Sequence, residues 1–349
     1  MDQTEEIKSK VSVVDLVAEY VTLKKAGRNF KGLCPFHSEK TPSFIVSPER
    51  QIWHCFGCGK GGDAFTFLME MERIEFPEAL KILADKAGVK LKTTPYQSRE
   101  GRLKERLRQI NHLASEFYHY LLTKHTIGER ARRYLKERGI KDQSVATFKL
   151  GFAPESWDNL YRFLRKKGYV LSDIEKAGLI LKGQHGYYDR FRGRVMFPLT
   201  NHRGEVIGFA GRVLEKDAKG AKYINTPETP LYIKGNTVYG LSVTKDAIRR
   251  ANKAVVVEGE FDVISSFQAG VSNVVAIKGS ALTEAQVLLL KRFAGSLVLA
   301  LDQDIAGDAA IRRGIEIADS SGLSIYVASS FGGKDPDEAA RIDPVAWKE

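Results

Sequence analysis

All three cysteines of the chain lie between positions 34 and 58, where they form two short pairs with a histidine. Two residues separate Cys34 from His37, and two residues separate Cys55 from Cys58. Each pair can form a tight turn that directs both ligands at one ion, and three thiolates with one imidazole suit tetrahedral Zn²⁺. Four protein ligands leave no open position on the metal. The pattern therefore predicts one structural zinc ion.

A second histidine in this segment, His54, competes for the fourth ligand position. It lies between Trp53 and Cys55 in a run with the pattern of a strand, where neighbouring side chains face opposite ways. If Cys55 faces the metal, His54 faces away, so His37 is the predicted ligand. Basic and aromatic residues alternate through the segment, which suits single-stranded nucleic acid, although most of the rings equally suit the core of a small zinc domain.

Acidic side chains follow three predicted strands in the last third of the chain, each at its carboxyl end. They are Glu258 after residues 254–257, Asp302 and Asp304 after residues 297–301, and Asp335 and Asp337 after residues 323–328. Predicted helices separate these strands, and this alternation predicts a parallel sheet whose carboxyl ends share one edge. Clustered carboxylates repel one another unless cations neutralise them, and oxygen ligands suit Mg²⁺ or Mn²⁺. We expect two or more such cations, with Asp262 as a supporting residue.

The net charge of +11 is unevenly distributed along the chain. Residues 96–254 carry 32 Lys and Arg against 16 Asp and Glu, a net +16, whereas residues 255–349 carry 8 against 14, a net −6. A basic centre joined to an acidic end suits a polyanion held by the first and cations held by the second. Arg190, Arg192 and Arg194 alternate, so in an extended chain they share one face that can meet phosphates, or that is simply solvated.

Length and composition limit the classes of protein to which the chain can belong. Its 349 residues predict two or three domains, and 43% hydrophobic residues exclude a disordered chain. The longest apolar runs have strand length, too short for a membrane helix. The first residues lack the basic end and apolar stretch of a secretory signal, and the cysteines form no paired disulfide framework, so we expect a cytoplasmic protein.

We predict a multidomain α+β fold with boundaries at changes of composition. A small zinc ribbon occupies residues 1–95, a basic α+β subdomain residues 96–253, and an α/β subdomain with a mainly parallel sheet residues 254–349. Residues 92–101 are expected to form a linker before a helix over 103–122. Thr126 and Glu129 have the spacing of a capping box that starts the next helix.

Two of these motifs resemble a known family. The run Cys34-Pro-Phe-His37-Ser-Glu-Lys-Thr-Pro-Ser-Phe and the run from His54-Cys-Phe-Gly-Cys to Asp63 resemble the CHC2 zinc-binding domain of bacterial DNA primases of the DnaG type. A Glu after one strand, Asp-x-Asp after another and a further acidic pair resemble the Toprim domain, which these primases share with topoisomerases and some nucleases. The zinc motif and the Toprim pattern together favour a primase.

The resemblance implies a DNA-directed RNA polymerase that makes short RNA primers from ribonucleoside triphosphates on a single-stranded DNA template. It implies catalysis by Glu258, Asp302 and Asp304 with Mg²⁺ or Mn²⁺, and work at the replication fork in the nucleoid, away from membranes. It also implies contacts with template or nucleotide phosphates by a set of basic residues: Arg138, Arg212, Lys222 and Lys234. The family binds the replicative helicase through a domain that we do not find in these 349 residues.

Two positions depart from the family pattern, and two other functions stay open. Glu260 stands where an aromatic residue is usual, and Gln303 stands where glycine is usual. Glu260 adds a negative charge near the expected cations, which leaves the metal occupancy and the strength of the activity open. A Toprim nuclease or topoisomerase would cleave strands. A catalytically incomplete fragment would only bind single-stranded DNA.

Overall fold

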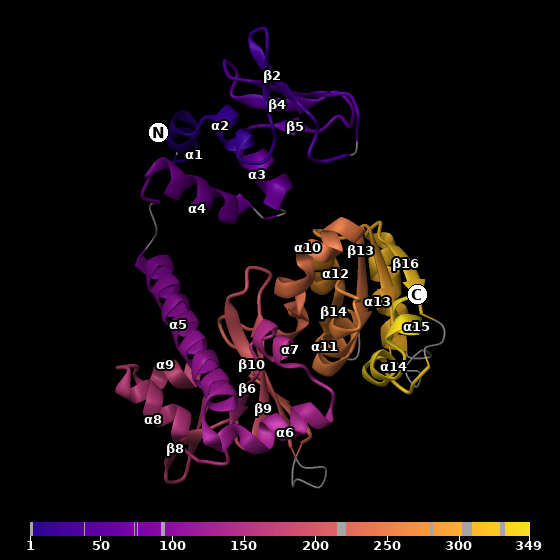
Figure 1. Ribbon diagram of the computed structural model, residues 1–349. Coiled ribbons are helices and arrows are strands. Elements are labelled where there is room, and N and C mark those ends of the chain that lie inside the picture. The colour runs from indigo at the N-terminus through magenta and orange to yellow at the C-terminus, as the bar shows by residue number, and fades with distance from the viewer. Residues whose placement is uncertain are drawn as a thin grey trace. The chain divides into compact units, whose positions relative to one another are not determined.

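The computed structural model describes residues 3–37, 39–72, 74, 76–91, 95–214, 221–279, 282–301, 309–328 and 332–349 (Figure 1). The chain divides into two compact units, Met1–Ser98 and Arg99–Glu349, which are described separately below. The predicted fold class is confirmed, because a unit with a Cys/His metal cluster precedes mixed α+β structure and a mainly parallel sheet. No helix among the described residues is long and apolar enough to cross a membrane.

The first unit consists of an antiparallel sheet flanked by short helices. Its elements are α1 (Gln3–Lys10), α2 (Val13–Ala18), β1 (Lys24–Ala26), β2 (Asn29–Gly32), β3 (Phe44–Ser47), β4 (Ile52–Cys55), β5 (Gly61–Gly62), α3 (Ala64–Glu72) and α4 (Phe76–Ala87). The five strands are paired in chain order, each antiparallel to the next. The longest connection, between Gly32 and Phe44, carries Cys34 and His37, and the other connections are short turns.

An aromatic cluster forms the core of the first unit. The Trp53 ring stacks on Phe44 with centroids 5.2 Å apart, and Phe67 of α3 packs edge-on against Trp53 at 5.8 Å. All three side chains are buried. Phe56 differs from them, because 75% of its surface is exposed. Most rings of this segment thus form core, and Phe56 lies at the surface.

The second unit begins with a long helix and a four-stranded sheet. The elements of this first half are α5 (Pro95–Thr123), η1 (Thr126–Gly128), α6 (Glu129–Glu137), α7 (Asp142–Thr147), β6 (Gly151–Ala153), α8 (Asn159–Lys166), α9 (Leu171–Lys176), β7 (Ile180–Gly183), β8 (Gly186–Asp189), β9 (Arg194–Thr200), β10 (Val206–Val213), β11 (Tyr223–Asn225) and η2 (Lys234–Asn236). The sheet has the order β11-β10-β9-β6 and is antiparallel, while β7 and β8 form a separate hairpin.

Two expectations for local structure in this half are wrong. The linker expected over 92–101 is helical from Pro95 onward, because proline is well tolerated in the first turn of a helix. The capping box expected at Thr126 is replaced by His125, whose Nδ1 accepts a hydrogen bond from the Ile127 N–H at 3.1 Å. Thr126 itself opens a 3₁₀ turn before α6.

The rest of the second unit is a sheet covered by helices on both faces (Figure 1). Its elements are β12 (Val238–Tyr239), α10 (Leu241–Ala251), β13 (Lys253–Val257), α11 (Glu260–Gln268), β14 (Val274–Ile277), α12 (Glu284–Lys291), β15 (Ser296–Leu299), α13 (Ala309–Ser320), β16 (Ser324–Val327), α14 (Pro336–Ile342) and α15 (Pro344–Lys348). The strand order is β12-β14-β13-β15-β16, in which β12 is antiparallel and the other four are parallel.

Alternation along β13 divides the core between the two faces of this sheet. Ala254 and Val256 pack with α12 and α13, whereas Val255 and Val257 face α11 and the first half of the unit. The largest core cluster joins both halves, since Phe197 of β9 meets the ring of Phe261 on α11 at 5.2 Å. This shared core places the carboxyl edge of the parallel sheet next to the basic half.

Candidate functional site

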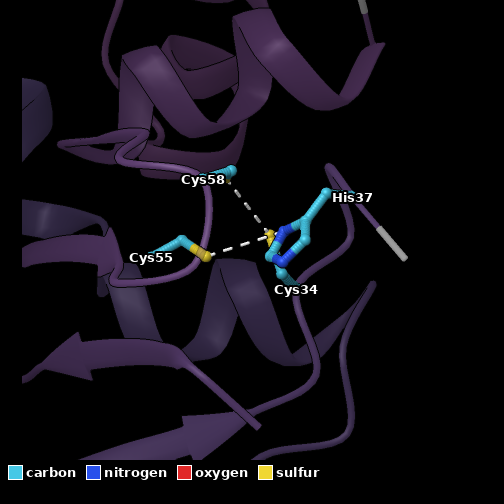
Figure 2. Close-up of side chains that lie close together, drawn as sticks. All are labelled: Cys34, His37, Cys55 and Cys58. Atoms are coloured by element: carbon cyan, nitrogen blue, oxygen red, sulfur yellow. Dashed lines mark hydrogen bonds between the residues drawn. The ribbon is translucent and has the colours of Figure 1, made fainter. Parts of the chain in front are cut away.

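The predicted zinc ligands come together in the first unit. Cys34 and His37 follow β2, Cys55 is the last residue of β4, and Cys58 lies in the turn after it. Their ligand atoms all lie within 4.8 Å of one another. Figure 2 shows the four side chains pointing at a common centre, with Cys34 Sγ 3.9 Å from Cys58 Sγ and Cys55 Sγ 3.7 Å from His37 Nδ1.

The pleat of β4 selects His37 over His54. Trp53 and Cys55 are buried, whereas Ile52 and His54 are exposed on the opposite face of the strand, as the alternation predicts. Gly57, between the two cysteines of the second pair, leaves the room that the imidazole needs. A Cβ at this position would lie 2.7 Å from His37 Nε2.

Hydrogen bonds around the cluster hold it in place and favour thiolate at one sulfur. Glu39 accepts from the Cys34 N–H at 2.7 Å and from the Ser43 hydroxyl at 2.5 Å. Burial alone would raise the pKa of Cys55, but hydrogen bonding with Ser43 and bonds from backbone N–H groups lower this pKa to about 6. Burial raises the pKa of Cys34 to about 12. Three sulfurs and one imidazole at these separations fit a tetrahedral zinc ion with no open position.

The structure describes part of the predicted acidic edge. Asp302 and Asp304 lie outside the described residues, as does Gln303. Glu258 follows β13, and Asp262 lies in the first turn of α11. The Asp262 carboxylate accepts from the Gly259 N–H at 2.8 Å and from the Asp337 N–H at 3.2 Å. Asp262 therefore links the starts of α11 and α14.

The two acidic residues of α14 have different partners. Asp335 caps the helix by accepting from the Glu338 N–H at 2.8 Å. Asp337 is buried, and its carboxylate accepts from Arg138 Nη2 and from Ser265 Oγ, both at 2.5 Å. Arg341 lies 3.3 Å from the same carboxylate. Asp337 is thus held between the basic half and the parallel sheet.

Two arginines of the basic half reach this edge across Phe261, the second residue of α11. The guanidinium carbon of Arg138 lies 4.2 Å from the centroid of the Phe261 ring, and that of Arg212, on β10, lies 5.4 Å from it. The Nε and Nη1 atoms of Arg212 are buried and have no hydrogen-bond partner among the described residues. Buried guanidinium donors without partners fit an anionic ligand such as a phosphate.

The other predicted phosphate contacts lie apart from this pair. Lys222 is exposed just before β11, and Lys234 is exposed in η2, where its backbone N–H donates to Glu228 at 2.9 Å. Sequence reasoning missed Lys278, which follows β14 and pairs with Glu260. Its position at the carboxyl end of a parallel strand is the signal that could have identified it.

The three alternating arginines do not share one strand face, which corrects the sequence prediction. The strand β9 begins only at Arg194, because Gly193 has a positive φ of 60° that breaks the extended run. Arg194 is buried and donates to the backbone carbonyls of Gly211, Ala221 and Lys222. Its donors are therefore used within the fold.

Arg192 takes a more exposed position beside aromatic rings. Its guanidinium carbon lies 4.3 Å from the centroid of Trp157, a side chain that is 66% exposed. Both residues line a pocket of about 490 Å³, to which Arg130, Arg190 and Arg194 also contribute. Arg190 donates from Nε to the Asn225 carbonyl at 3.2 Å. A cationic pocket with an exposed ring suits single-stranded nucleic acid.

Comparison with known proteins places these features in one class. Family models match the chain as a CHC2 zinc finger over residues 1–99, as the N-terminal domain of a DNA primase catalytic core over 117–245 and as a Toprim-like domain over 255–340. The class is that of proteins in which a zinc ribbon precedes a Toprim-containing catalytic core.

Similar proteins narrow the class to a family. A DNA primase of Listeria monocytogenes serovar 1/2a is 41% identical over 99% of this chain, and one of Geobacillus stearothermophilus is 44% identical over 97%. The zinc-binding and RNA polymerase domains of the Aquifex aeolicus primase are 36% identical with a TM-score of 0.62, over 97% of this chain and 81% of that one. The chain belongs to the DnaG-type DNA primase family.

Two further findings bear on function. A solved structure titled as a DnaG primase catalytic domain bound to ssDNA is 33% identical, with a TM-score of 0.64, over 71% of this chain and 78% of that one. The chain spans 56% of the length of the Listeria monocytogenes primase and 57% of that from Geobacillus stearothermophilus.

Proposed function

We propose that this chain synthesises short RNA primers on single-stranded DNA. Membership of the DnaG-type family supports the proposal. The observation that carries it is the approach of Arg138 and Arg212, over the Phe261 ring, to the acidic edge of the Toprim-like sheet. A polymerase needs cations for the triphosphate beside carboxylates for metal, and this edge offers both.

The reaction is a nucleotidyl transfer. The 3′-hydroxyl of the growing primer attacks the α-phosphate of the incoming ribonucleoside triphosphate, the new P–O bond forms and pyrophosphate leaves. The buried, unpartnered donors of Arg212 are placed to hold phosphate oxygens, and Lys222 and Lys234 would add positive charge on the solvent side. Arg138, held by Asp337, would present its cation to the same anion without moving far.

Divalent cations fit the acidic edge by the chemistry of its donors. We assign Glu258, Asp302, Asp304, Asp335 and Asp337 as the ligands, with Asp262 in support. All supply carboxylate oxygens, as Mg²⁺ and Mn²⁺ prefer. When bound, such cations would activate the attacking hydroxyl and stabilise charge on the leaving pyrophosphate. Asp337 is bonded to Arg138 and Ser265, so it would have to release one of them to contact a metal.

The template would bind along the basic half of the second unit. Trp157 provides an exposed ring on which a base can stack, and Arg192 lies over that ring to meet the adjacent phosphate. In the first unit, the exposed Phe56 and the basic residues of the sheet would contact template as well. These contacts read no base edge, so they predict binding that is tolerant of sequence.

The test is an assay with single-stranded DNA, ribonucleoside triphosphates and Mg²⁺ or Mn²⁺. The proposal predicts RNA primers from the parent chain, a loss of several orders of magnitude in Asp304→Ala, and a rise of about tenfold or more in the nucleotide KM of Arg212→Ala. Arg250→Ala, which removes an exposed arginine of α10, is the matched control and should retain normal synthesis.

The same reactions distinguish the other functions. Cleaved DNA would indicate a Toprim nuclease or topoisomerase, and a gel shift without either product would indicate a DNA-binding fragment. Normal synthesis by Asp304→Ala would show that the catalytic cations bind elsewhere. Circular dichroism and a DNA-binding titration of each variant separate loss of chemistry from loss of fold.

A further inference from the structure

A buried ion pair lies at the carboxyl ends of two neighbouring parallel strands. Glu260 follows β13 and opens α11, and Lys278 follows β14, the strand paired with β13. The Lys278 ammonium donates to the Glu260 carboxylate, and the two side chains are 8% and 4% exposed. Each partner of a buried ion pair depends on the other, because removing either side chain leaves an uncompensated charge away from water.

The surroundings of the pair are largely aromatic. The negative charge of Glu260 acts, after burial, to raise the pKa of Tyr232 and of Tyr239. The hydroxyls of both tyrosines are buried without a hydrogen-bond partner among the described residues. Among the described residues, Lys278 is the cation that forms an ion pair with Glu260, so Lys278 neutralises this carboxylate.

The pair also lies next to the proposed reaction site. Glu260 is two residues from Glu258 and two from Asp262 in the sequence. Burial raises the pKa of Tyr223, Glu260 raises it further, and the charges of Arg212 and Arg138 lower it. The guanidinium carbon of Arg212 lies 5.7 Å from the Tyr223 ring centroid, and both arginines contact the ring of Phe261, the residue after Glu260.

We propose that Lys278 is a positioning residue that neutralises and pins Glu260, so that this carboxylate neither adds charge to the cation site nor binds a cation itself. This inference rests on the proposed function, because it concerns the cations at the same edge. It accounts for the tolerance of an acidic residue at position 260, since the extra negative charge expected from the sequence is cancelled by a partner 18 residues away.

The sign of the effect on cation binding distinguishes this role from simple structural support. Lys278→Met leaves a negative charge at the edge and should strengthen Mn²⁺ binding while misplacing the ion. Glu260→Gln leaves a positive charge and should weaken Mn²⁺ binding. The double variant restores neutrality and should bind Mn²⁺ like the parent chain. A purely structural pair would weaken binding in both single variants.

The experiment measures Mn²⁺ binding by electron paramagnetic resonance in the whole chain, together with primer synthesis across a Mg²⁺ titration. We expect a half-saturating Mn²⁺ concentration about fivefold lower in Lys278→Met and about fivefold higher in Glu260→Gln. We expect kcat to fall about tenfold in Lys278→Met and to recover to within about threefold of the parent in the double variant. Lys278→Arg should behave like the parent, and Lys253→Met, at the opposite end of β13, is the control.

Three results would overturn the proposal. The half-saturating Mn²⁺ concentration could shift in the same direction in both single variants, or it could stay unchanged in both. The double variant could also synthesise primers no faster than Lys278→Met. If Lys278→Met fails to fold, Glu260→Gln, Lys278→Arg and the double variant still provide the comparison. A parent chain that binds Mn²⁺ but makes no primers contradicts the proposed function and leaves the binding comparison valid. A parent chain that binds no Mn²⁺ at this edge removes the role assigned to Lys278.

Discussion

Arg138 Nη2 donates a 2.5 Å hydrogen bond to Asp337 Oδ2 across 199 positions of sequence. The bond connects the end of α6, in the basic half of the second unit, to α14 beside the parallel sheet. The Asp337 side chain is 4% exposed, and that of Arg138 is 26% exposed. Because the Asp337 carboxylate is shielded from water, its negative charge is stabilised by Arg138 far more than an exposed carboxylate would be by the same partner.

Arg138→Met should lower the free energy of unfolding of the second unit by about 2–4 kcal/mol, because it leaves a buried carboxylate with fewer partners. Ser265 and Arg341 remain in contact with Asp337 and limit the loss. Urea denaturation followed by circular dichroism measures the change. Arg133→Met, which removes an exposed arginine of the same helix, should change stability by less than about 0.5 kcal/mol. Equal stability of the two variants would contradict the assignment.

Gly57→Ala should abolish stoichiometric zinc binding. The added Cβ would lie 2.7 Å from His37 Nε2 and 2.8 Å from Ser43 Oγ, so the imidazole could not keep its place among the sulfurs. Elemental analysis of protein purified without chelator should find about one zinc per parent chain and much less in the variant. Phe56→Ala, at the exposed neighbouring position, should retain the metal. The zinc-free first unit should unfold at lower temperature, because small metal domains derive much of their stability from the ion.

Substitutions of Arg192 and Arg194 should affect different properties, DNA binding and stability, although the two residues are only two positions apart. Arg194→Met removes hydrogen bonds to three backbone carbonyls and should destabilise the second unit by about 1–3 kcal/mol. Arg192→Met removes one such hydrogen bond, to the Asp189 carbonyl at 2.6 Å, so it should cost about 1 kcal/mol or less but weaken binding of single-stranded DNA and lessen its salt dependence. Thermal unfolding and fluorescence-anisotropy titrations at two salt concentrations separate the effects. Weakened DNA binding in a fully stable Arg194→Met would refute the division of roles.

His202 should make the second unit less stable in mild acid. Burial, followed by the charges of Arg292 and Lys245, lowers the pKa of His202 to about 4. An unfolded chain has a histidine pKa of about 6.5, so it binds more protons than the folded chain between these values. Stability from this residue is therefore complete above pH about 6.5 and is lost as the pH falls toward 4.

The His202 imidazole is only partly buried, and solvent screens its charge. We therefore expect this residue to change the free energy of unfolding by about 1–2 kcal/mol between neutral and acidic pH. Denaturation at pH 7.5 and 5.0 should show a smaller difference in His202→Gln than in the parent chain. His185→Gln, in the exposed turn between β7 and β8, should retain the parent difference. An unchanged difference in His202→Gln would exclude this histidine as the source.

The elements that sequence reasoning located best are those with a strong local pattern. The alternation of strands and helices from residue 254 predicted the parallel sheet, and Thr283 with Gln286 forms the capping box expected at α12. The zinc ligands were predictable for two reasons. The short spacing within each ligand pair places both side chains at one ion, and the alternation of side chains along the strand that ends at Cys55 excludes His54. Such features depend on residues close together in the sequence, where spacing constrains geometry.

Features that depend on distant contacts were not predictable from the same patterns. Nothing near Lys278 indicates that it pairs with Glu260, and nothing near Arg138 indicates that it holds Asp337. The arginines at 190, 192 and 194 had the spacing of one strand face, but Gly193 turns the backbone between them. For the two ion pairs the partner comes from another element, which only the packed structure brings near.

The core shared by the two halves of the second unit has a consequence for the kinetics of folding. Leu122 and Phe197 belong to the same cluster as Val257 and Ala300, so neither half can complete its core before the other has been synthesised. Contacts between residues so far apart require large loops to close first, which slows folding. The first unit packs against itself within its own 98 residues and has no such requirement. Refolding from denaturant should therefore occur in two phases, with tryptophan fluorescence from Trp53 recovering ahead of that from Trp347.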